Sequence, residues 1–234
     1  MSLTLKNATL SRKKFHIGPL TWQVNPGEIW AVLGTNGSGK STLLKMMAGV
    51  LAPHSGELSL NQSTKSKYTG DEWARRVAWM QGVSPIYFRF KVRDLLKMGR
   101  FPHGPEKAEE WIQNALEIFE LKAYETSYID ELSEGEKQRV RLAQSWVQDA
   151  EFWLLDEPFE HLDIKYQRRL ADLFKVQVAN KKAVICVSHY LQEALSWATH
   201  ILWLKSGEIV HAGPLNDTLI DSVFEQTFNV PFKR

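Results

Sequence analysis

A glycine-rich stretch at residues 34–42 has the residue types and spacing needed to hold phosphate groups. It reads Gly34-Thr35-Asn36-Gly37-Ser38-Gly39-Lys40-Ser41-Thr42 and fits the pattern G-x-x-x-x-G-K-[ST] at every fixed position. Glycines let the backbone approach a phosphate with its N–H groups turned inward, and a helix N-terminus adds partial positive charge there. Lys40 can reach the β- and γ-phosphates, and the Ser41 hydroxyl can ligate Mg²⁺. The stretch predicts binding of a nucleoside triphosphate, but it does not indicate how the energy is used.

An apolar run that ends in two carboxylates could supply the rest of such a site. Residues 152–158 read FWLLDEP, so a buried strand would deliver Asp156 to the sheet edge beside the glycine-rich loop. We expect Asp156 to hold Mg²⁺ there and the adjacent Glu157 to polarise an attacking water as general base. Taken alone, the run is also compatible with a strand that ends in an ordinary charged turn.

The elements that must position these residues alternate between strands and helices. The N-terminal 33 residues read as strands and turns, and the last strand, 28–33, leads into the glycine-rich loop. Further strands are predicted at 76–80, 152–155 and 183–187, with helices near 164–179 and 190–197 and a hairpin over 201–210. This alternation implies a mainly parallel sheet. The segment 92–148 has helical periodicity throughout, which makes about 82–148 a candidate helical subdomain.

Composition restricts the kinds of partner. The chain has 234 residues, 44% of them apolar, and a net charge of +2 with no long basic run, so we expect no nucleic acid partner. Its single cysteine, Cys186, falls in an apolar run that predicts a buried strand. We find no signal-like N-terminal block and no apolar segment approaching the roughly 20 residues that cross a bilayer. A role in membrane transport would therefore require separate membrane-spanning partners.

Further motifs make the pattern specific. Gln81 ends a predicted strand, Leu132-Ser133-Glu134-Gly135-Glu136 opens a predicted helix, Leu162-Asp163 follows the two carboxylates, and Ser188-His189 follows the strand at 183–187. With the glycine-rich loop and residues 154–158, they resemble the Walker A loop, Q-loop, signature, Walker B strand, D-loop and switch histidine of the ATP-binding cassette (ABC) ATPases. The motifs occur in the family's order, and the resemblance runs from about residue 3 to 230.

The resemblance implies an α/β fold: a P-loop NTPase core with a mainly parallel sheet, an antiparallel β subdomain and a helical subdomain that carries the signature. All of residues 1–234 would form a single ABC ATPase domain, with about 82–148 as the helical subdomain within it. The ligands implied are ATP and Mg²⁺.

The resemblance also implies a site divided between two copies of the chain, which sandwich two ATP molecules head to tail. Ser133 and Gly135 would meet the γ-phosphate held by the other copy, with Glu136 beside them. His189 would contact the γ-phosphate from the same chain as Glu157. Gln81 would sense Mg²⁺ or the attacking water and link the site to the helical subdomain, and Asp163 would lie at the seam between the copies.

Two departures from the family pattern stand out. The signature usually reads Leu-Ser-Gly-Gly-Gln, and here Glu134 and Glu136 replace a glycine and the glutamine. Ser133 followed three residues later by Glu136 is also a capping-box pattern, so Glu136 can equally serve to fix the helix start. The aromatic residue that usually stacks on adenine would fall near residues 11–12, where Arg12 could stack its planar guanidinium; Phe15 is the nearest aromatic.

A further resemblance indicates a particular branch of the ABC ATPases. Residues 92–103 read VRDLLKMGRFPH, similar to the "V-x-x-x-V-x-x-G-R-x-P-H" stretch of importer ATPases for iron chelates, haem and cobalamin, and residues 161–164 read HLDI as theirs do. This branch implies integral-membrane permease subunits as partners, an indirect link to a substrate-binding protein, and a peripheral location on the cytoplasmic face of the inner membrane. The aromatic-rich residues 83–90 are the expected docking surface, unless those aromatics fill the seam between the subdomains.

Alternatives remain at this point. The chain could be the ATPase of another class of ABC transporter or a soluble ABC ATPase without a transport role. A simple P-loop kinase gives no reason for the signature, Gln81 and His189 to occur together.

Overall fold

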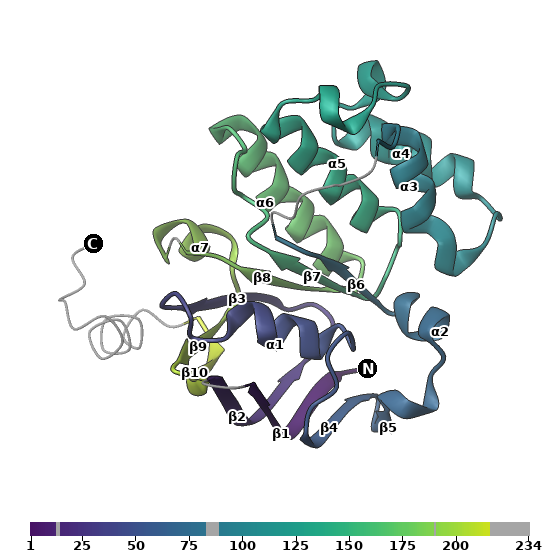
Figure 1. Ribbon diagram of the computed structural model, residues 1–234. Coiled ribbons are helices and arrows are strands. Elements are labelled where there is room, and N and C mark those ends of the chain that lie inside the picture. The colour runs from purple at the N-terminus through teal and green to yellow at the C-terminus, as the bar shows by residue number, and fades with distance from the viewer. Residues whose placement is uncertain (13–14, 83–88, 190, 216–234) are drawn as a thin grey trace.

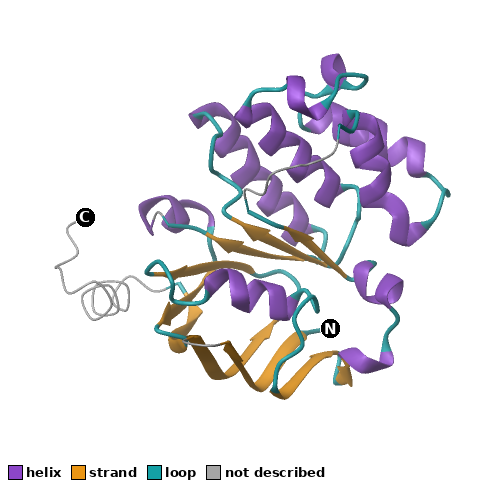
Figure 2. Cartoon of the chain, in the orientation of Figure 1, coloured by secondary structure: helices purple, strands orange, loops and turns teal. Residues whose placement is uncertain are grey.

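The computed structural model describes residues 1–12, 15–82, 89–189 and 191–215. Two β-sheets and a group of helices build the molecule: an antiparallel sheet lies at one end, a mainly parallel sheet crosses the middle, and helices gather at the other end (Figures 1 and 2). This arrangement confirms the expected fold class.

The antiparallel sheet has the strand order β2-β1-β4-β5. Its strands are β1 (Leu3–Arg12), β2 (Phe15–Val24), β4 (Ser55–Leu60) and β5 (Ser63–Thr64). Strand β1 pairs with β2 on one side, as Leu3 with Val24, and with β4 on the other, as Leu3 with Leu60. Strands β1 and β2 lie in the N-terminal part that the sequence predicted to form strands and turns, and β4 and β5 are additional to the predicted elements.

The central sheet has the strand order β10-β9-β3-β8-β7-β6. Its members are β3 (Ile29–Gly34), β6 (Val77–Met80), β7 (Phe152–Asp156), β8 (Ala183–Val187), β9 (His200–Lys205) and β10 (Glu208–Pro214). Only β10 runs antiparallel, paired with β9 in the predicted hairpin. Because β3, β8, β7 and β6 are parallel neighbours, their carboxyl ends meet at one edge of the sheet. That edge receives the glycine-rich loop, His189, Asp156 and Gln81.

Two hydrophobic cores cover the two faces of this sheet. In β3, Ile29, Ala31 and Leu33 belong to one core, and Trp30 and Val32 to the other. This follows from the two-residue period of a strand, which turns successive side chains to opposite faces. Helix α1 (Lys40–Met47) lies between the two sheets and fills the second core with its apolar side chains (Figure 1).

The helical region covers the first core. It contains α3 (Val92–Arg100), α4 (Ala108–Ile118) and α5 (Glu134–Trp146), with short 3₁₀ segments η2 (Phe101–His103), η3 (Lys122–Tyr124) and η4 (Ile129–Glu131). Helices α6 (Ile164–Ala179) and α7 (Leu191–Trp197) follow β7 and β8, while η1 (Lys65–Lys67) and α2 (Gly70–Ala74) precede β6. Among the described residues no helix is both long and apolar enough to traverse a bilayer.

Candidate nucleotide-binding site

The glycine-rich loop joins β3 to α1, as the sequence predicted. Gly39 is the N-cap of α1 and has a φ of 108°, a conformation that glycine adopts without steric cost. The loop is closed by hydrogen bonds from the Ser38 amide to the Thr35 carbonyl (3.1 Å) and from the Gly207 amide to the Ser38 carbonyl (2.9 Å). The free amides at the start of α1 therefore lie beside a fixed loop.

Lys40 is buried and turned onto its own loop. Its ammonium group donates to the carbonyls of Gly34 (2.9 Å) and Thr35 (3.1 Å). Burial lowers the pKa of this ammonium, while the nearby charges of Glu157 and Asp156 act in the opposite direction. Lys40 thus sits where an anionic ligand would replace the two carbonyls as its partner.

A cavity of about 380 Å³ opens over the loop. Its lining unites the residues expected to hold phosphate with the expected base and the switch histidine. The lining residues are Phe15, Asn36, Gly37, Gly39, Lys40, Ser41, Thr42, Glu157 and His189. Phe15, the aromatic nearest to the position expected for adenine stacking, thus lines this cavity, whereas the side chain of Arg12 lies outside the described part of the structure.

Asp156 ends β7 and lies 5% exposed beside the loop. Burial raises the pKa of its carboxyl group, while a hydrogen bond with Ser41 opposes that rise. Its Oδ1 atom is buried and has no hydrogen-bond partner among the described residues. A buried carboxylate oxygen without a partner, next to a serine hydroxyl, is a donor set that suits a hard cation such as Mg²⁺.

Glu157 follows in a sharp turn, where its φ of 54° is unusual for a residue with a side chain. One carboxylate oxygen contacts Nε2 of His189, so the expected base and the switch histidine are in direct contact. Glu160 also shares a hydrogen bond with Glu157, and burial together with this contact raises the pKa of Glu160. The three side chains form an interacting group beside the phosphate-binding loop.

The signature residues begin α5 and do not line this cavity. Ser133 is the exposed N-cap, and its hydroxyl donates to Glu136 Oε2 (2.7 Å) while accepting from the Glu136 amide (3.4 Å). This is the capping box that the sequence allowed, so Glu136 fixes the start of the helix. Glu134 pairs with Lys137 at 2.8 Å. Ser133 therefore presents its side chain at an exposed helix N-terminus.

Gln81 and Asp163 occupy separate positions around the site. Asp163 is the exposed N-cap of α6 and accepts a hydrogen bond from the Tyr166 amide (2.9 Å). Gln81 follows β6 and lines a neighbouring groove instead of the cavity above the loop. The next residue, Gly82, lies close to Asp156, because a Cβ built on it would be 3.5 Å from the Asp156 carbonyl oxygen. The groove and the expected metal site are thus adjacent.

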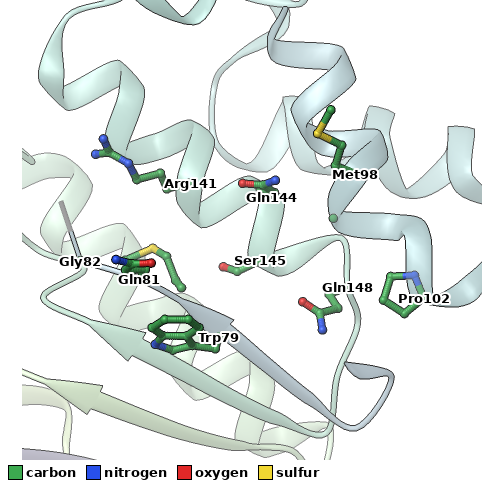
Figure 3. Close-up of a pocket in the computed structure, with 11 residues that line it drawn as sticks. Trp79, Gln81, Gly82, Met98, Pro102, Arg141, Gln144, Ser145 and Gln148 are labelled. Carbon is green, nitrogen blue, oxygen red and sulfur yellow. The ribbon is translucent and has the colours of Figure 1, made fainter. Parts of the chain in front are cut away.

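This groove has a volume of about 420 Å³ and lies between the end of β6 and the helices α3 and α5 (Figure 3). Arg141, Gln144 and Ser145 of α5 form one wall, which Gln148 continues just after the end of the helix. The other lining residues are Trp79, Met80, Gln81, Gly82, Met98, Gly99 and Pro102. Sequence reasoning did not identify the α5 wall, although the three- and four-residue spacing of its members after the signature is the pattern of one helix face.

The expected docking segment 83–90 is described only at its end, because residues 83–88 lie outside the described residues. Arg89 pairs with Asp130 (3.3 Å) and Glu131 (3.0 Å), and Phe90 packs against the core of the helical region. For Phe90, this contact agrees with the alternative that the aromatic residues of the segment fill the core.

The last residues of the importer-like stretch, 92–103, make contacts with the segment after α5. Arg100 is buried, donates to the Val147 carbonyl (3.1 Å) and lies over the ring of Trp111. His103 bonds the carbonyl of Gln148 through Nε2 (2.8 Å). The stretch therefore ties α3 and η2 to the residues that directly follow α5.

Comparison with known proteins agrees with this geometry. Residues 17–160 match the family described as "ABC transporter". The chain belongs to this family and is an ATP-hydrolysing, nucleotide-binding subunit.

Several curated relatives are similar over most of their length. The petrobactin import ATP-binding protein YclP of Bacillus subtilis is 32% identical, with 88% of this chain and 84% of the relative covered. The hemin import ATP-binding protein HmuV of Escherichia coli O157:H7 is 34% identical, with 82% and 78% covered.

Among solved structures, the ATP-binding subunit of an ABC transporter superposes with a TM-score of 0.86 at 24% identity, covering 97% of this chain and 95% of that one. A metal-chelate type ABC transporter in an inward-facing conformation gives 0.82 at 23%, covering 98% and 90%. Both similarities show that this chain has the fold of an ABC ATPase.

Proposed function

We propose that the cavity over the glycine-rich loop binds Mg-ATP and that Glu157 is the general base for its hydrolysis. The observation that carries this proposal is the lining of one cavity by the loop, Glu157 and His189 together. ATP phosphates would take the loop amides and the ammonium of Lys40, which now bonds two carbonyls of its own loop.

Ser41 and Asp156 are the residues that would hold Mg²⁺. Their contact with each other and the unpartnered Oδ1 of Asp156 support this assignment. Gln81 would be a further ligand or sensor of Mg²⁺. The residue after it, Gly82, lies close to the Asp156 carbonyl, which supports this assignment. Among the described residues no cluster of three or more His, Cys, Asp or Glu side chains could bind a metal unaided, so phosphate oxygens would complete the set. Mg²⁺ held by these residues would neutralise charge on the phosphate oxygens.

Glu157 would accept a proton from the attacking water, and His189 would hold the carboxylate in place or turn to the γ-phosphate. Their direct contact supports the first role, and the place of His189 in the cavity lining supports the second. Phe15 is the better supported platform for the adenine ring, since it lines the cavity with the loop.

A second copy of the chain would complete the site. Ser133, Gly135 and Glu136 lie at the start of α5, outside the cavity lining of their own chain, and would face the nucleotide of the partner. The exposed position of Asp163 at the start of α6 suits contact at the seam between the copies. The phosphate-binding loop of one chain and the signature of the other would then enclose each ATP.

The transport role rests on the relatives. Because several of them import petrobactin or hemin, we infer that this chain energises uptake of an iron chelate or a related metal complex. Its partners would be integral-membrane permease subunits, with a substrate-binding protein acting through them, and it would sit on the cytoplasmic face of the membrane. The groove beside Gln81 is where a permease segment would dock, and the exposed side chain of Met98 is part of its lining.

The test of the catalytic assignment is Glu157→Gln. This variant should bind ATP as the original chain does but hydrolyse it about 10²–10⁴-fold more slowly, because the proton acceptor is lost. Chelation of Mg²⁺ with EDTA should abolish hydrolysis by the original chain. Glu117→Gln, on the exposed face of α4, is the matched control and should keep the parental rate. Parental hydrolysis by Glu157→Gln would show that another group is the base.

A further inference from the structure

The turn that carries Glu157 is held in an unusual backbone conformation. Glu157 has a φ of 54°, and its amide donates to the Val187 carbonyl at 3.2 Å. A residue with a side chain occupies this region only where surrounding contacts favour it. The direction in which the Glu157 carboxylate points therefore depends on whatever holds this turn.

Gln138 holds the turn from the signature helix. Its side chain is fully buried, and Nε2 lies 3.1 Å from the carbonyl oxygen of Glu157 and 3.1 Å from that of Pro158. Both partners are acceptors only, so the amide nitrogen must face them. One side chain of α5 thus fixes two successive carbonyls of the turn.

The other end of the same amide points toward the groove. Gln138 Oε1 accepts a hydrogen bond from Arg141 Nη1 at 3.2 Å, and a guanidinium can only donate, which agrees with the orientation of the amide. Arg141 is part of the α5 wall of the groove (Figure 3). A continuous chain of hydrogen bonds therefore runs from the groove through Arg141 and Gln138 to the backbone of Glu157.

We propose that Gln138 is a positioning residue for Glu157 and that Arg141 makes this positioning depend on what occupies the groove. The inference rests on the proposed function, in which Glu157 is the base and the groove receives a permease segment. A ligand in the groove that moves the Arg141 guanidinium changes the support of Gln138, and with it the aim of the Glu157 carboxylate. The groove and Glu157 are thus coupled through contiguous hydrogen bonds, in which Gln138 is the buried residue.

The first test is Gln138→Leu, which keeps the volume but cannot donate. Hydrogen exchange at the amides of Glu157, Phe159 and Glu160 should be about 10-fold faster, since the turn loses its bonds to Gln138. ATP turnover should fall about 10- to 100-fold, with the KM for ATP within about twofold of the parent, because the base is misplaced while the loop is intact. Gln177→Leu, at a similarly buried glutamine on α6, is the control and should leave both quantities unchanged.

A double-mutant cycle tests the path. If Gln138 acts through Glu157, Gln138→Leu should not lower the residual rate of Glu157→Gln any further; an equal fold-loss in both backgrounds indicates a general structural role. Arg141→Met, at a partly exposed position, should slow turnover of the original chain but leave turnover of Gln138→Leu unchanged. An equal effect of Arg141→Met in both backgrounds overturns the link to the groove.

The outcomes separate the two proposals. An original chain that does not hydrolyse ATP contradicts the proposed function, and the exchange measurement then decides the inference alone. Unchanged exchange at Glu157, Phe159 and Glu160 in Gln138→Leu overturns the positioning role even if the original chain is active.

Discussion

Substitution of Gly99 by alanine tests how closely α3 and α5 must pack to form the groove. A Cβ at Gly99 would lie 2.2 Å from the backbone oxygen of Gln144 and 2.8 Å from Val147 Cγ2. The first contact is with a carbonyl inside a helix, so a side-chain rotation cannot relieve it. The two helices would have to separate by roughly 1 Å to restore an ordinary carbon–oxygen distance.

The expected magnitude comes from two opposing effects. Overpacking typically costs about 1–3 kcal/mol, and because backbone must move here we take about 2–4 kcal/mol. Alanine is favoured over glycine within a helix by about 1 kcal/mol, which offsets part of that cost. We expect a net loss of about 1–3 kcal/mol, which corresponds to a drop of about 2–12 °C in Tm for a domain of this size.

Thermal unfolding followed by circular dichroism measures this change. The control is Gly70→Ala in α2, where an added Cβ meets nothing within 4 Å, and the Tm of this variant should stay level or rise slightly. If Gly99→Ala unfolds within 1 °C of the original chain, the close approach of α3 to α5 is not required for stability. Because Gly99 lines the groove, the same variant should also weaken association with permease-containing membranes.

Two further predictions concern stability. Phe174→Ala should cost about 3–5 kcal/mol in urea unfolding, because this fully buried ring contacts three other aromatic rings, whereas Val176→Ala on the exposed side of the same helix should change stability by less than about 0.5 kcal/mol. Hydrogen bonds from Tyr124 and Ser133 lower the pKa of Glu136, so its stabilising contribution is present above the unfolded-state pKa of about 4.3 and is lost as the pH falls through the folded-state value. The gap in urea midpoint between the original chain and Glu136→Gln should therefore shrink from pH 7 to about pH 3.5; a gap that is independent of pH would contradict the assignment.

The sequence predicted well the elements whose signals are local. The strand, loop and helix over residues 29–47 follow from an apolar run and from the glycine pattern with the helix expected after it, and all three are confirmed. Strands β4 and β5 were missed because β4 has only two apolar side chains and takes its hydrogen bonds from β1, about 50 residues away along the chain. Helix α2 was missed although Thr69 and Glu72 form a capping box, since the helix is only 5 residues long.

The site was partly predictable for the same reason. Parallel strands bring their carboxyl ends together, so the meeting of the glycine-rich loop, Glu157 and His189 follows from order and strand direction. The roles proposed for Gln138 and Arg141 could not be predicted from strand order and direction, because they depend on the packing of α5 against a turn that is distant in sequence. The capping function of Glu136 was one of two readings of the signature and is the one the contacts support for the isolated chain.

The single cysteine offers a built-in reporter of motion in the central sheet. Cys186 lies in β8 between β3 and β7, is fully buried, and has a pKa raised well above its ordinary value by burial. The thiolate is the nucleophile that attacks thiol reagents, so labelling of the native chain should be slow and should occur only when the sheet opens. The labelling rate of Cys186 therefore measures how often the sheet opens, without an engineered probe. A second thiol introduced beside the groove would be distinguishable because it would be labelled faster.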